Sequence, residues 1–265
     1  MRRLHANGID IACHVAPHAD TDRPWLVFAH SLACDHTMWA PQLDAFGADF
    51  SLLAYDMRGH GGSSVTDGDY PLELLADDLA ALLDAQGIAR CHFVGLSLGG
   101  MVGQMAALRH PARFGSLTLA DTTSRQPPGA HAVWDERLAT VRAHGMAPLV
   151  QPTLERWFTP AFRASHAQEV ARIGALIRGT PAAGYAGCAH AVVNIDLTAQ
   201  LPRIACPVLV IVGRDDAGTT PAMAQDIASA IPGARLVVLD AAAHLSNIEQ
   251  AQAFNAALRA FLPPG

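Results

Sequence analysis

The chain has 265 residues, of which 51% are hydrophobic and 16% are charged. That balance excludes a disordered protein and allows one domain with a sizeable core. The formal net charge of −6 at pH 7 argues against nucleic acid or an anionic membrane as a partner. Because all 18 basic residues are arginines, Schiff-base chemistry on a lysine and the phosphate-binding lysine of a P-loop are excluded.

The cysteines and the N-terminal segment bear on the cellular compartment. The five cysteines are scattered and form no C-x-x-C pair, which predicts a reduced cytoplasmic protein. No apolar run is long enough for a secretory signal or a membrane span. The chain also lacks an H-E-x-x-H motif, so no metal site is predicted.

Six apolar segments rich in β-branched residues predict strands. Most of them are continuously hydrophobic rather than alternating, as is typical of parallel strands buried on both faces of a sheet. They cover residues 25–30, 50–56, 92–97, 116–121, 207–213 and 234–240.

Segments with helical spacing separate these strands, at residues 72–87, directly after Ser97, and at 221–231 and 247–262. The last two begin with helix start signals, which are Pro221 in a first turn and Asn247 as an N-cap followed by Glu249. Strands and helices that alternate in this order predict a doubly wound α/β fold with a mostly parallel twisted sheet.

The alternation stops between residues 122 and 204. This segment is rich in proline, contains several helical patterns, of which 134–145 is the clearest, and has no convincing strand. The strand pattern resumes at Pro207. We therefore predict a helical cap at 122–204, inserted into an α/β core formed by residues 1–121 and 205–265.

The pentapeptide from Gly95 to Gly99, GLSLG, fits the G-x-S-x-G nucleophile elbow. It lies between an apolar strand and a helix, where a sharp turn would hold Ser97 in a strained conformation and require glycines two residues away on either side. The backbone N–H of Leu98 would then point into the same space as the serine hydroxyl. The motif predicts a serine nucleophile.

A serine hydroxyl needs a base, and the base needs a carboxylate that holds its tautomer. His244 follows the strand at 234–240, and Asp215 and Asp216 follow the strand at 207–213. The order Ser, Asp, His is the one that this fold uses. We favour Asp216 because it lies further into its loop, with Asp215 and Asp121 as the alternatives.

An oxyanion intermediate calls for a second backbone donor beside Leu98. The loop HSLACD follows the first long strand, and its Ser31-Leu32 backbone is the natural source, with the Leu32 N–H favoured. An ordinary polar loop is the alternative interpretation. Cys34 in this loop lacks an elbow and is assigned to packing. Eight other histidines are interpreted as polar surface or turn residues, namely His30, His36, His60, His110, His131, His144, His166 and His190.

Together these segments resemble the α/β-hydrolase superfamily, from about residue 4 to residue 263. The quoted segments are AHSLACDHTMWAPQL, YDMRGHGGS, VGLSLGGMVGQ, VGRDDAGTTP and AAHLSNIEQ. RWFTPAF and GYAGCAHA, within the insertion, resemble the 3-oxoadipate enol-lactonase group. The resemblance implies hydrolysis of a small carboxylated lactone, with Ser97 as nucleophile, Asp216 as acid and His244 as base. In YDMRGHGGS, Arg58 and His60 are expected to be structural.

The resemblance also implies a substrate pocket. Trp134 matches a tryptophan that lines the pocket in that family, and we add Ser31 and Trp157 as candidate substrate-binding residues. Taken one by one, the aromatic residues of the cap are more often part of its core than of a pocket lining, namely Trp134, Trp157, Phe158, Phe162 and Tyr185. Arg125 or Arg137 could hold a substrate carboxylate, although a surface arginine is the simpler interpretation of each.

Other functions remain open on the same scaffold. These are a general short-chain carboxylesterase, a cofactor-free haloperoxidase or perhydrolase, and a non-catalytic ligand receptor. The hydrolase mechanism needs no metal or organic cofactor, and its partner is a small ester or lactone. The oligomeric state is left open, with a homodimer among the possibilities.

Overall fold

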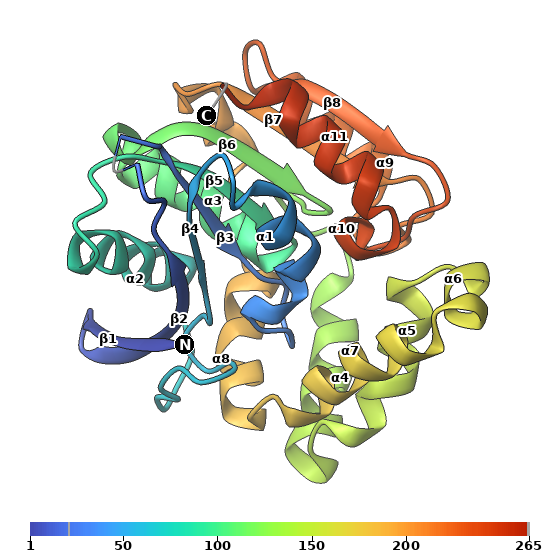
Figure 1. The fold of residues 1–265 in the computed structure, drawn as a ribbon. Coiled ribbons are helices and arrows are strands. Elements are labelled where there is room, and N and C mark those ends of the chain that lie inside the picture. The colour runs from blue at the N-terminus through green and yellow to red at the C-terminus, as the bar shows by residue number, and fades with distance from the viewer. Residues whose placement is uncertain (21, 264–265) are drawn as a thin grey trace.

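The computed structural model describes residues 1–20 and 22–263. In this part of the chain, eight strands form one sheet in the order β1-β2-β4-β3-β5-β6-β7-β8 (Figure 1). Strands β3 to β8 are parallel, whereas β2 runs antiparallel to both β1 and β4. The strands are β1 (Arg2–Ala6), β2 (Ile9–Ala16), β3 (Trp25–Ala29), β4 (Ser51–Tyr55), β5 (Cys91–Leu96), β6 (Phe114–Ala120), β7 (Val208–Gly213) and β8 (Arg235–Leu239).

The six parallel strands coincide with the six predicted ones to within two residues at either end. Every residue of β4 and β7 is buried, which explains why their sequences are continuously apolar. The hairpin of β1 and β2 was not predicted. Its turn is Asn7-Gly8, with φ of 48° and 75°, and an Asn-Gly pair between short strands is a strong hairpin signal.

Helices cover both faces of the sheet (Figure 1). α2 and α3 pack together, and α3 lies against β5 and β6. α1 contacts α11 in front of the sheet, and α9 contacts β7 and β8. Their bounds are α1 (Ala40–Phe46), α2 (Leu72–Ala85), α3 (Leu98–Arg109), α9 (Pro221–Ala230), α10 (Ser246–Glu249) and α11 (Ala251–Phe261).

The helix expected at 247–262 is two helices, and the assignment of Asn247 as its N-cap is wrong. The backbone breaks at Gln250, with φ −124° and ψ 50°. Asn247 lies inside α10 and is buried; its side-chain amide donates to Met38 O (3.0 Å) and to Gln42 Oε1 (3.1 Å). Its polar group therefore ties α10 to the segment at α1, a long-range contact that capping rules do not anticipate.

Between β6 and β7 the described residues form helices joined by loops and turns, with one isolated bridge between Arg125 and Asp196. Figure 1 shows α4 to α7 as a group set apart from the sheet, with α8 lying between this group and the core. The helices are α4 (Ala130–His144), α5 (Val150–Trp157), α6 (Pro160–Ser165), α7 (Ala167–Gly179) and α8 (Ala182–Val193).

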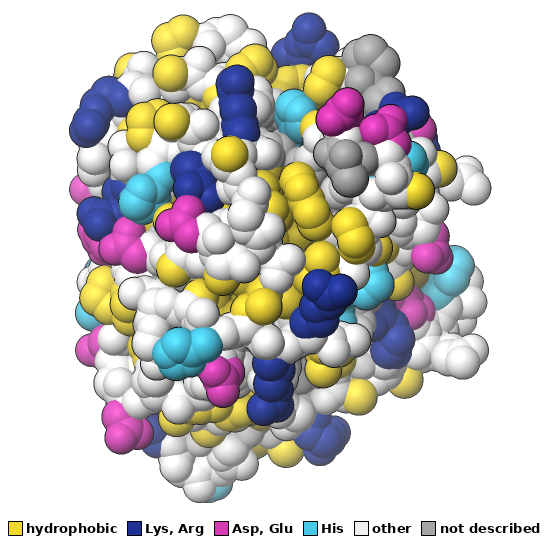
Figure 2. Space-filling model, turned by 60° about the vertical axis from the view of Figure 1, so that its left-hand side comes forward, with side chains coloured by type: hydrophobic (Ala, Val, Ile, Leu, Met, Phe, Trp, Pro, Cys, Tyr) yellow, Lys and Arg dark blue, Asp and Glu magenta, His cyan; other side chains and the backbone are white. Residues whose placement is uncertain are grey.

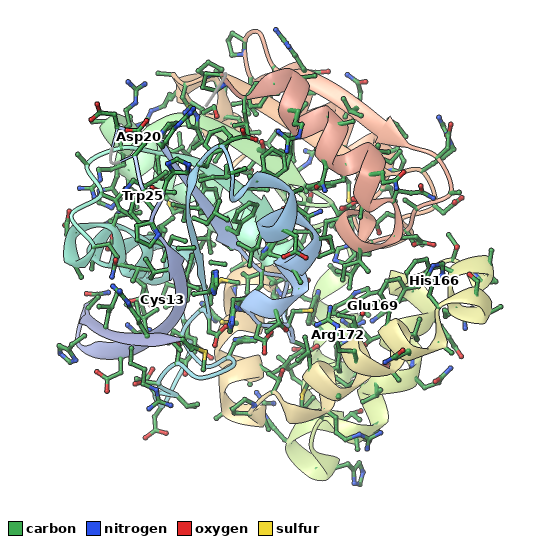
Figure 3. All side chains as sticks on the ribbon, in the orientation of Figure 1. Cys13, Asp20, Trp25, His166, Glu169 and Arg172 are labelled. Atoms are coloured by element: carbon green, nitrogen blue, oxygen red, sulfur yellow. The ribbon has the colours of Figure 1, made fainter. Side chains whose placement is uncertain are left out.

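Close contacts join α8 and α7 to the core. Backbone meets backbone where α8 crosses the turn at Gly59, because a Cβ on Gly184 would lie 1.9 Å from Gly59 O. On α7, Arg172 forms an ion pair with Glu169 (Figure 3), and its guanidinium donates to Thr37 Oγ1 of the core at 3.2 Å. These contacts fix α7 and α8 against the core.

The face in Figure 2 carries basic and acidic side chains interspersed with one another rather than gathered by sign. Hydrophobic side chains lie between them across the same face. Among the helices of the described residues, none is both long and apolar enough to cross a membrane.

The contact between Gly59 and Gly184 generates a stability prediction. Gly184→Ala must push two backbone segments apart, so we expect it to lower the free energy of unfolding by about 1–3 kcal/mol. Urea denaturation measures this change. Gly179→Ala, on α7 with open space around its Cα, is the matched control and should lose no stability. Equal stability of the two variants would contradict the close packing.

Candidate active site

Ser97 stands at the turn between β5 and α3. Its backbone has φ 56° and ψ −113°, which is strained for a residue with a side chain, and its N–H donates to Ala120 O at 2.9 Å. A Cβ on Gly95 would lie 2.2 Å from Gly99 O, and one on Gly99 would lie 2.1 Å from Ala29 O. The two flanking positions therefore accept only glycine.

Two further candidate residues meet at the carboxyl ends of β7 and β8. His244 Nδ1 lies 2.8 Å from Asp216 Oδ2. The other carboxylate oxygen of Asp216 accepts the N–H groups of Gly218 (2.8 Å) and Thr219 (3.0 Å), and the Thr219 hydroxyl donates to Oδ2 at 2.6 Å. Asp216 is fully engaged and presents one fixed oxygen to the imidazole.

In the pair of His244 and Asp216, each group stabilises the charged form of the other. Burial alone would lower the pKa of His244, but the charge of Asp216 and the hydrogen bond to it raise that pKa above its ordinary value. Burial alone would raise the pKa of Asp216, whereas His244 and Thr219 bring it below the usual range. Asp216 is therefore ionised and stabilises a protonated His244.

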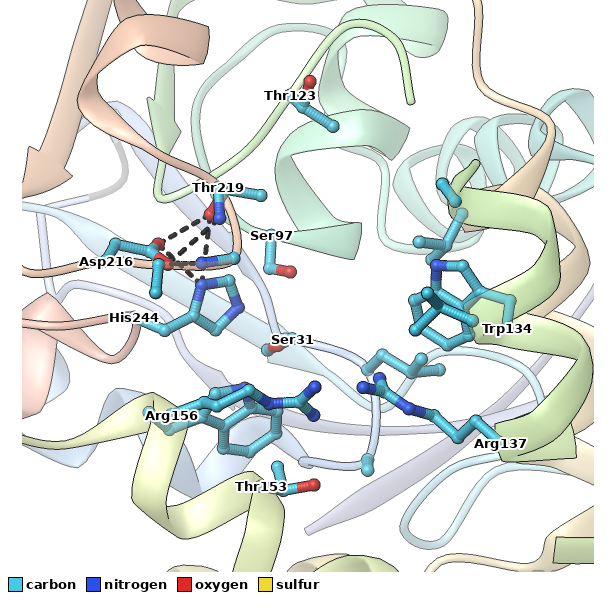
Figure 4. A pocket seen from close by; sticks show the side chains of 18 of the residues that line it. Ser31, Ser97, Thr123, Trp134, Arg137, Thr153, Arg156, Asp216, Thr219 and His244 are labelled. Carbon is cyan, nitrogen blue, oxygen red and sulfur yellow. Dashed lines mark hydrogen bonds and ion pairs between the residues drawn. The ribbon is translucent and has the colours of Figure 1, made fainter. Parts of the chain in front are cut away.

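Ser97 and His244 line the same cavity, whose volume is about 300 Å³. Figure 4 shows Ser97, Asp216 and His244 grouped on one side of it, with Trp134 and Arg137 on the opposite side. Among the described residues no hydrogen bond joins Ser97 Oγ to His244. Such bonds are often long in ligand-free enzymes and tighten when substrate binds.

Neither of the two alternative acids holds the imidazole. Asp215 is exposed, and only its backbone N–H is used, donating to Ala242 O. Asp121 is fully buried, but its carboxylate accepts the Gly213 N–H (2.8 Å) and the Ser246 hydroxyl (2.5 Å). Neither carboxylate bonds to His244.

Two backbone amides next to Ser97 and in the cavity lining have no partner in the described chain. In residues 1–20 and 22–263, neither Leu32 N–H nor Leu98 N–H donates a hydrogen bond. Leu98 begins α3, whose N-terminus favours negative charge. Next to Leu32, Ala33 has φ 63°, and its N–H donates to His60 Nε2 at 3.0 Å. The buried histidine thus holds the loop in this unusual conformation.

The interpretation of His30 and His60 as polar surface or turn residues is wrong. Both are completely buried, with ring centroids 5.2 Å apart. His30 Nε2 accepts the Met57 N–H at 2.9 Å. Burial lowers the pKa of His60 to about 3, so the ring is neutral and can accept. These rings support the backbone, which agrees with the structural role expected of His60.

The residues predicted to bind substrate all border the cavity, namely Ser31, Trp134 and Trp157. Ser31 Oγ is buried and has no hydrogen-bond partner in the described structure. Of the two arginines considered, Arg137 borders the cavity, whereas Arg125 lies outside it and faces Asp226 at 3.6 Å on the surface.

Arg156, Tyr185 and Thr219 also line the cavity, and sequence reasoning gave none of them a role in the site. Arg156 immediately precedes Trp157 in the RWFTPAF segment, and this position was the only sequence signal that could have placed it at the cavity. The direction of a side chain on a helix of eight residues cannot be read from so short a segment.

The loop that carries His244 is tied to the helical segment. Glu249 accepts the backbone N–H of the residue before His244 at 2.9 Å and, through its other oxygen, the Thr159 N–H at 3.0 Å. Leu245 N–H donates to Trp157 O at 3.2 Å. The Trp157 ring stacks on His244, with centroids 5.7 Å apart. The imidazole of His244 is therefore held by residues of the core and packed against the helical segment.

One group of side chains could hold a metal ion by distance alone. Asp35, His36 and Asp56 place ligand atoms within 4.8 Å of one another. Asp56 Oδ1 already accepts the His36 N–H (2.8 Å), and Oδ2 accepts the Gly62 N–H (2.7 Å). These bonds order the turn, and the group lies outside the cavity of Ser97.

An eight-stranded sheet with a strained serine after β5, an acid after β7 and a histidine after β8 defines the α/β-hydrolase class. Residues 24–251 match the family model for the alpha/beta hydrolase fold, and the chain belongs to this family.

Among curated proteins, 3-oxoadipate enol-lactonase 2 of Acinetobacter baylyi is 38% identical over 253 residues, covering 96% of this chain and 94% of that protein. The enol-lactonase structure from Burkholderia xenovorans LB400 matches with a TM-score of 0.94 and 38% identity, over 98% of this chain and 99% of that one. A malate-bound thermophilic esterase from Thermogutta terrifontis matches with a TM-score of 0.91 and 28% identity, over 98% and 96%. The protein is thus an enzyme of the esterase and lactonase type.

The raised pKa of Asp121 predicts that the stability of the protein depends on pH. Burial and the charge of Asp216 raise its pKa to about 8, so between about pH 4 and 8 the folded protein keeps a proton that the unfolded chain releases. Stability contributed by this site falls as pH rises through that interval. Asp121→Asn removes the linkage, so its free energy of unfolding relative to wild type should increase from about pH 5 to about pH 8.5.

Urea denaturation at the two pH values measures this difference. Asp215→Asn, on the exposed neighbour of Asp216, is the control and should show the same difference from wild type at both. An Asp121→Asn effect that is independent of pH would contradict the raised pKa.

Proposed function

We propose that this protein hydrolyses a carboxylic ester or lactone through Ser97, His244 and Asp216, and that its substrate is a small lactone like that of the 3-oxoadipate enol-lactonases. The observation that carries the proposal is the 2.8 Å contact between His244 and Asp216 in the cavity that Ser97 borders. The 38% identity to an enol-lactonase over nearly the whole chain supports the lactone.

In the first half-reaction, His244 Nε2 removes the proton of Ser97, whose oxygen attacks the substrate carbonyl. The N–H groups of Leu32 and Leu98, which have no other partner in the described chain, stabilise the oxyanion. Asp216 keeps the Nδ1 proton of His244 in place and stabilises the imidazolium. His244 then protonates the leaving alkoxide.

In the second half-reaction, water attacks the acyl-enzyme by the same route and releases the acid. When the substrate is a lactone, the alkoxide stays attached to the acyl group until this step. His244 must be neutral to act as the base, so activity falls as pH decreases through its raised pKa.

We further propose that residues 122–204 act as a cap that shapes the substrate site. Cavity residues from α4, α5, α7 and α8 support this assignment, because they face Ser97 from the side opposite the sheet. Five free cysteines, of which Cys13, Cys34, Cys91 and Cys188 are buried, support a location in the reducing cytoplasm.

The role of the nucleophile is tested by Ser97→Ala. We expect kcat for p-nitrophenyl acetate to fall at least about a thousandfold, since the covalent intermediate can no longer form. Ser165→Ala, on the exposed end of α6, is the control and should keep wild-type activity. Retention of more than a few per cent of the wild-type rate by a folded Ser97→Ala protein would exclude this mechanism.

The substrate class is tested with a panel of the enol-lactone derived from muconolactone, simple lactones and p-nitrophenyl esters of increasing chain length. We expect kcat/KM to be highest for the enol-lactone. Broad activity on short-chain esters would instead indicate a carboxylesterase. Bromination that depends on peroxide and a carboxylic acid would indicate a perhydrolase, and a single burst of product without turnover would indicate a receptor.

A further inference from the structure

The Thr219 side chain contacts both members of the acid and base pair beside Ser97. Its hydroxyl donates to Asp216 Oδ2 at 2.6 Å, and the same oxygen lies 3.1 Å from His244 Nδ1. His244 Nδ1 is itself 2.8 Å from Asp216 Oδ2. Figure 4 shows the three side chains grouped beside Ser97 with dashed lines between them. The three polar groups therefore form a closed triangle.

The Asp216 carboxylate uses all of its acceptor sites. An ionised carboxylate offers about four lone-pair sites. Oδ1 accepts the N–H groups of Gly218 and Thr219, and Oδ2 accepts the Thr219 hydroxyl and the imidazole N–H. The side chain of Asp216 is completely shielded from solvent. Loss of the Thr219 hydroxyl would leave one site of a buried charge without a donor.

The charge of Asp216 depends on these donors. Burial raises the pKa of its carboxyl, and the charge of His244, followed by hydrogen bonds from His244 and Thr219, outweighs that effect and brings the pKa below the usual range. The hydroxyl of Thr219 thus helps to keep the carboxylate ionised inside the protein.

The triangle also fixes the tautomer of the imidazole. The ionised Asp216 has no proton to donate, and the single hydroxyl proton of Thr219 is already directed to it. The hydrogen between the imidazole and these two oxygens must therefore come from His244 Nδ1. This tautomer leaves Nε2 free to take the proton of Ser97.

The backbone holds Thr219 in this position without a ligand. Its N–H donates to Asp216 Oδ1 at 3.0 Å. The next residue, Thr220, is the N-cap of α9, and its side chain accepts the Met223 N–H. Thr219 is itself buried. Its hydroxyl is therefore placed by the loop and by the start of α9.

We propose that Thr219 is a positioning residue whose hydroxyl keeps the Asp216 carboxylate and the His244 imidazole aligned for proton transfer at Ser97. This inference rests on the proposed function and adds a further side chain to it. Thr219 transfers no proton and acts through the other two residues. Since its hydroxyl is committed to them, substrate binding does not require it.

The test compares two pairs of side chains that differ by one hydroxyl, which are wild type with Thr219→Val and Thr219→Ser with Thr219→Ala. We expect Thr219→Val to lower kcat for p-nitrophenyl acetate about tenfold or more, because a hydrogen bond to a charged group is lost. KM should change less than about twofold, because valine keeps the shape of threonine. Thr219→Ser should stay within about threefold of wild type, and Thr219→Ala should lose as much as Thr219→Val.

Thr220→Val is the matched control, since it makes the same change one residue further along. It removes the N-cap of α9, so it should lower Tm while kcat stays within about twofold of wild type. If Thr219→Val does not fold, the pair of Thr219→Ser and Thr219→Ala decides the question. Equal kcat with and without the hydroxyl, or a rise in KM with kcat unchanged, would overturn the proposal.

A second measurement does not depend on catalysis. The Nδ1 proton of His244, hydrogen-bonded to a carboxylate, should give a 1H NMR resonance far downfield of the amide protons. We expect the same position in Thr219→Ser and a shifted or exchange-broadened signal in Thr219→Val. An identical resonance in Thr219→Val would contradict the positioning role. If wild type hydrolysed no ester, or Ser97→Ala kept the activity, the proposed function would fail, and this resonance alone would decide whether Thr219 orients the imidazole.

Discussion

The backbone at Ser97 holds a positive φ because three segments pack against it without room for side chains. β3, β5 and α3 meet at Gly95 and Gly99, where an added Cβ would lie about 2 Å from a carbonyl oxygen. The strain of one residue is thus balanced by close packing of the central sheet. The same packing orients the first amide of α3, at Leu98, so the geometry at this turn positions both the serine and the backbone N–H beside it.

Two carboxyl groups lie buried close to His244. Asp216 and Asp121 are both buried there, and two carboxylates at close quarters do not ionise equally. Asp216 is stabilised as an anion by His244 and Thr219, whereas Asp121 has a raised pKa and bonds to the backbone of β7 and to α10. One acid serves the imidazole, and the other joins neighbouring loops while remaining largely protonated at neutral pH.

Sequence patterns predicted the parallel strands because burial on both faces leaves a plain apolar signal. They also indicated Ser97, Asp216 and His244, since each follows a strand that ends at the same edge. The sequence patterns gave wrong predictions where long-range packing decides the position of a side chain. Asn247 points inward and bonds to the α1 region. His30 and His60 are buried and hold nearby backbone. Arg156 was missed because the direction of a side chain on a short helix depends on how that helix is placed.

The hydrogen bonds of Glu249 affect what happens when a segment of this protein is replaced by that of a related enzyme. This side chain joins Thr159 of the insertion to the loop that positions His244, and Trp157 packs on the imidazole itself. A chimaera that received only residues 122–204 from another enzyme would disturb His244, the proposed base, along with the lining of the cavity. A transplant that keeps these contacts has to move the loop and α10 together with the insertion, because the two sides bond and pack against each other.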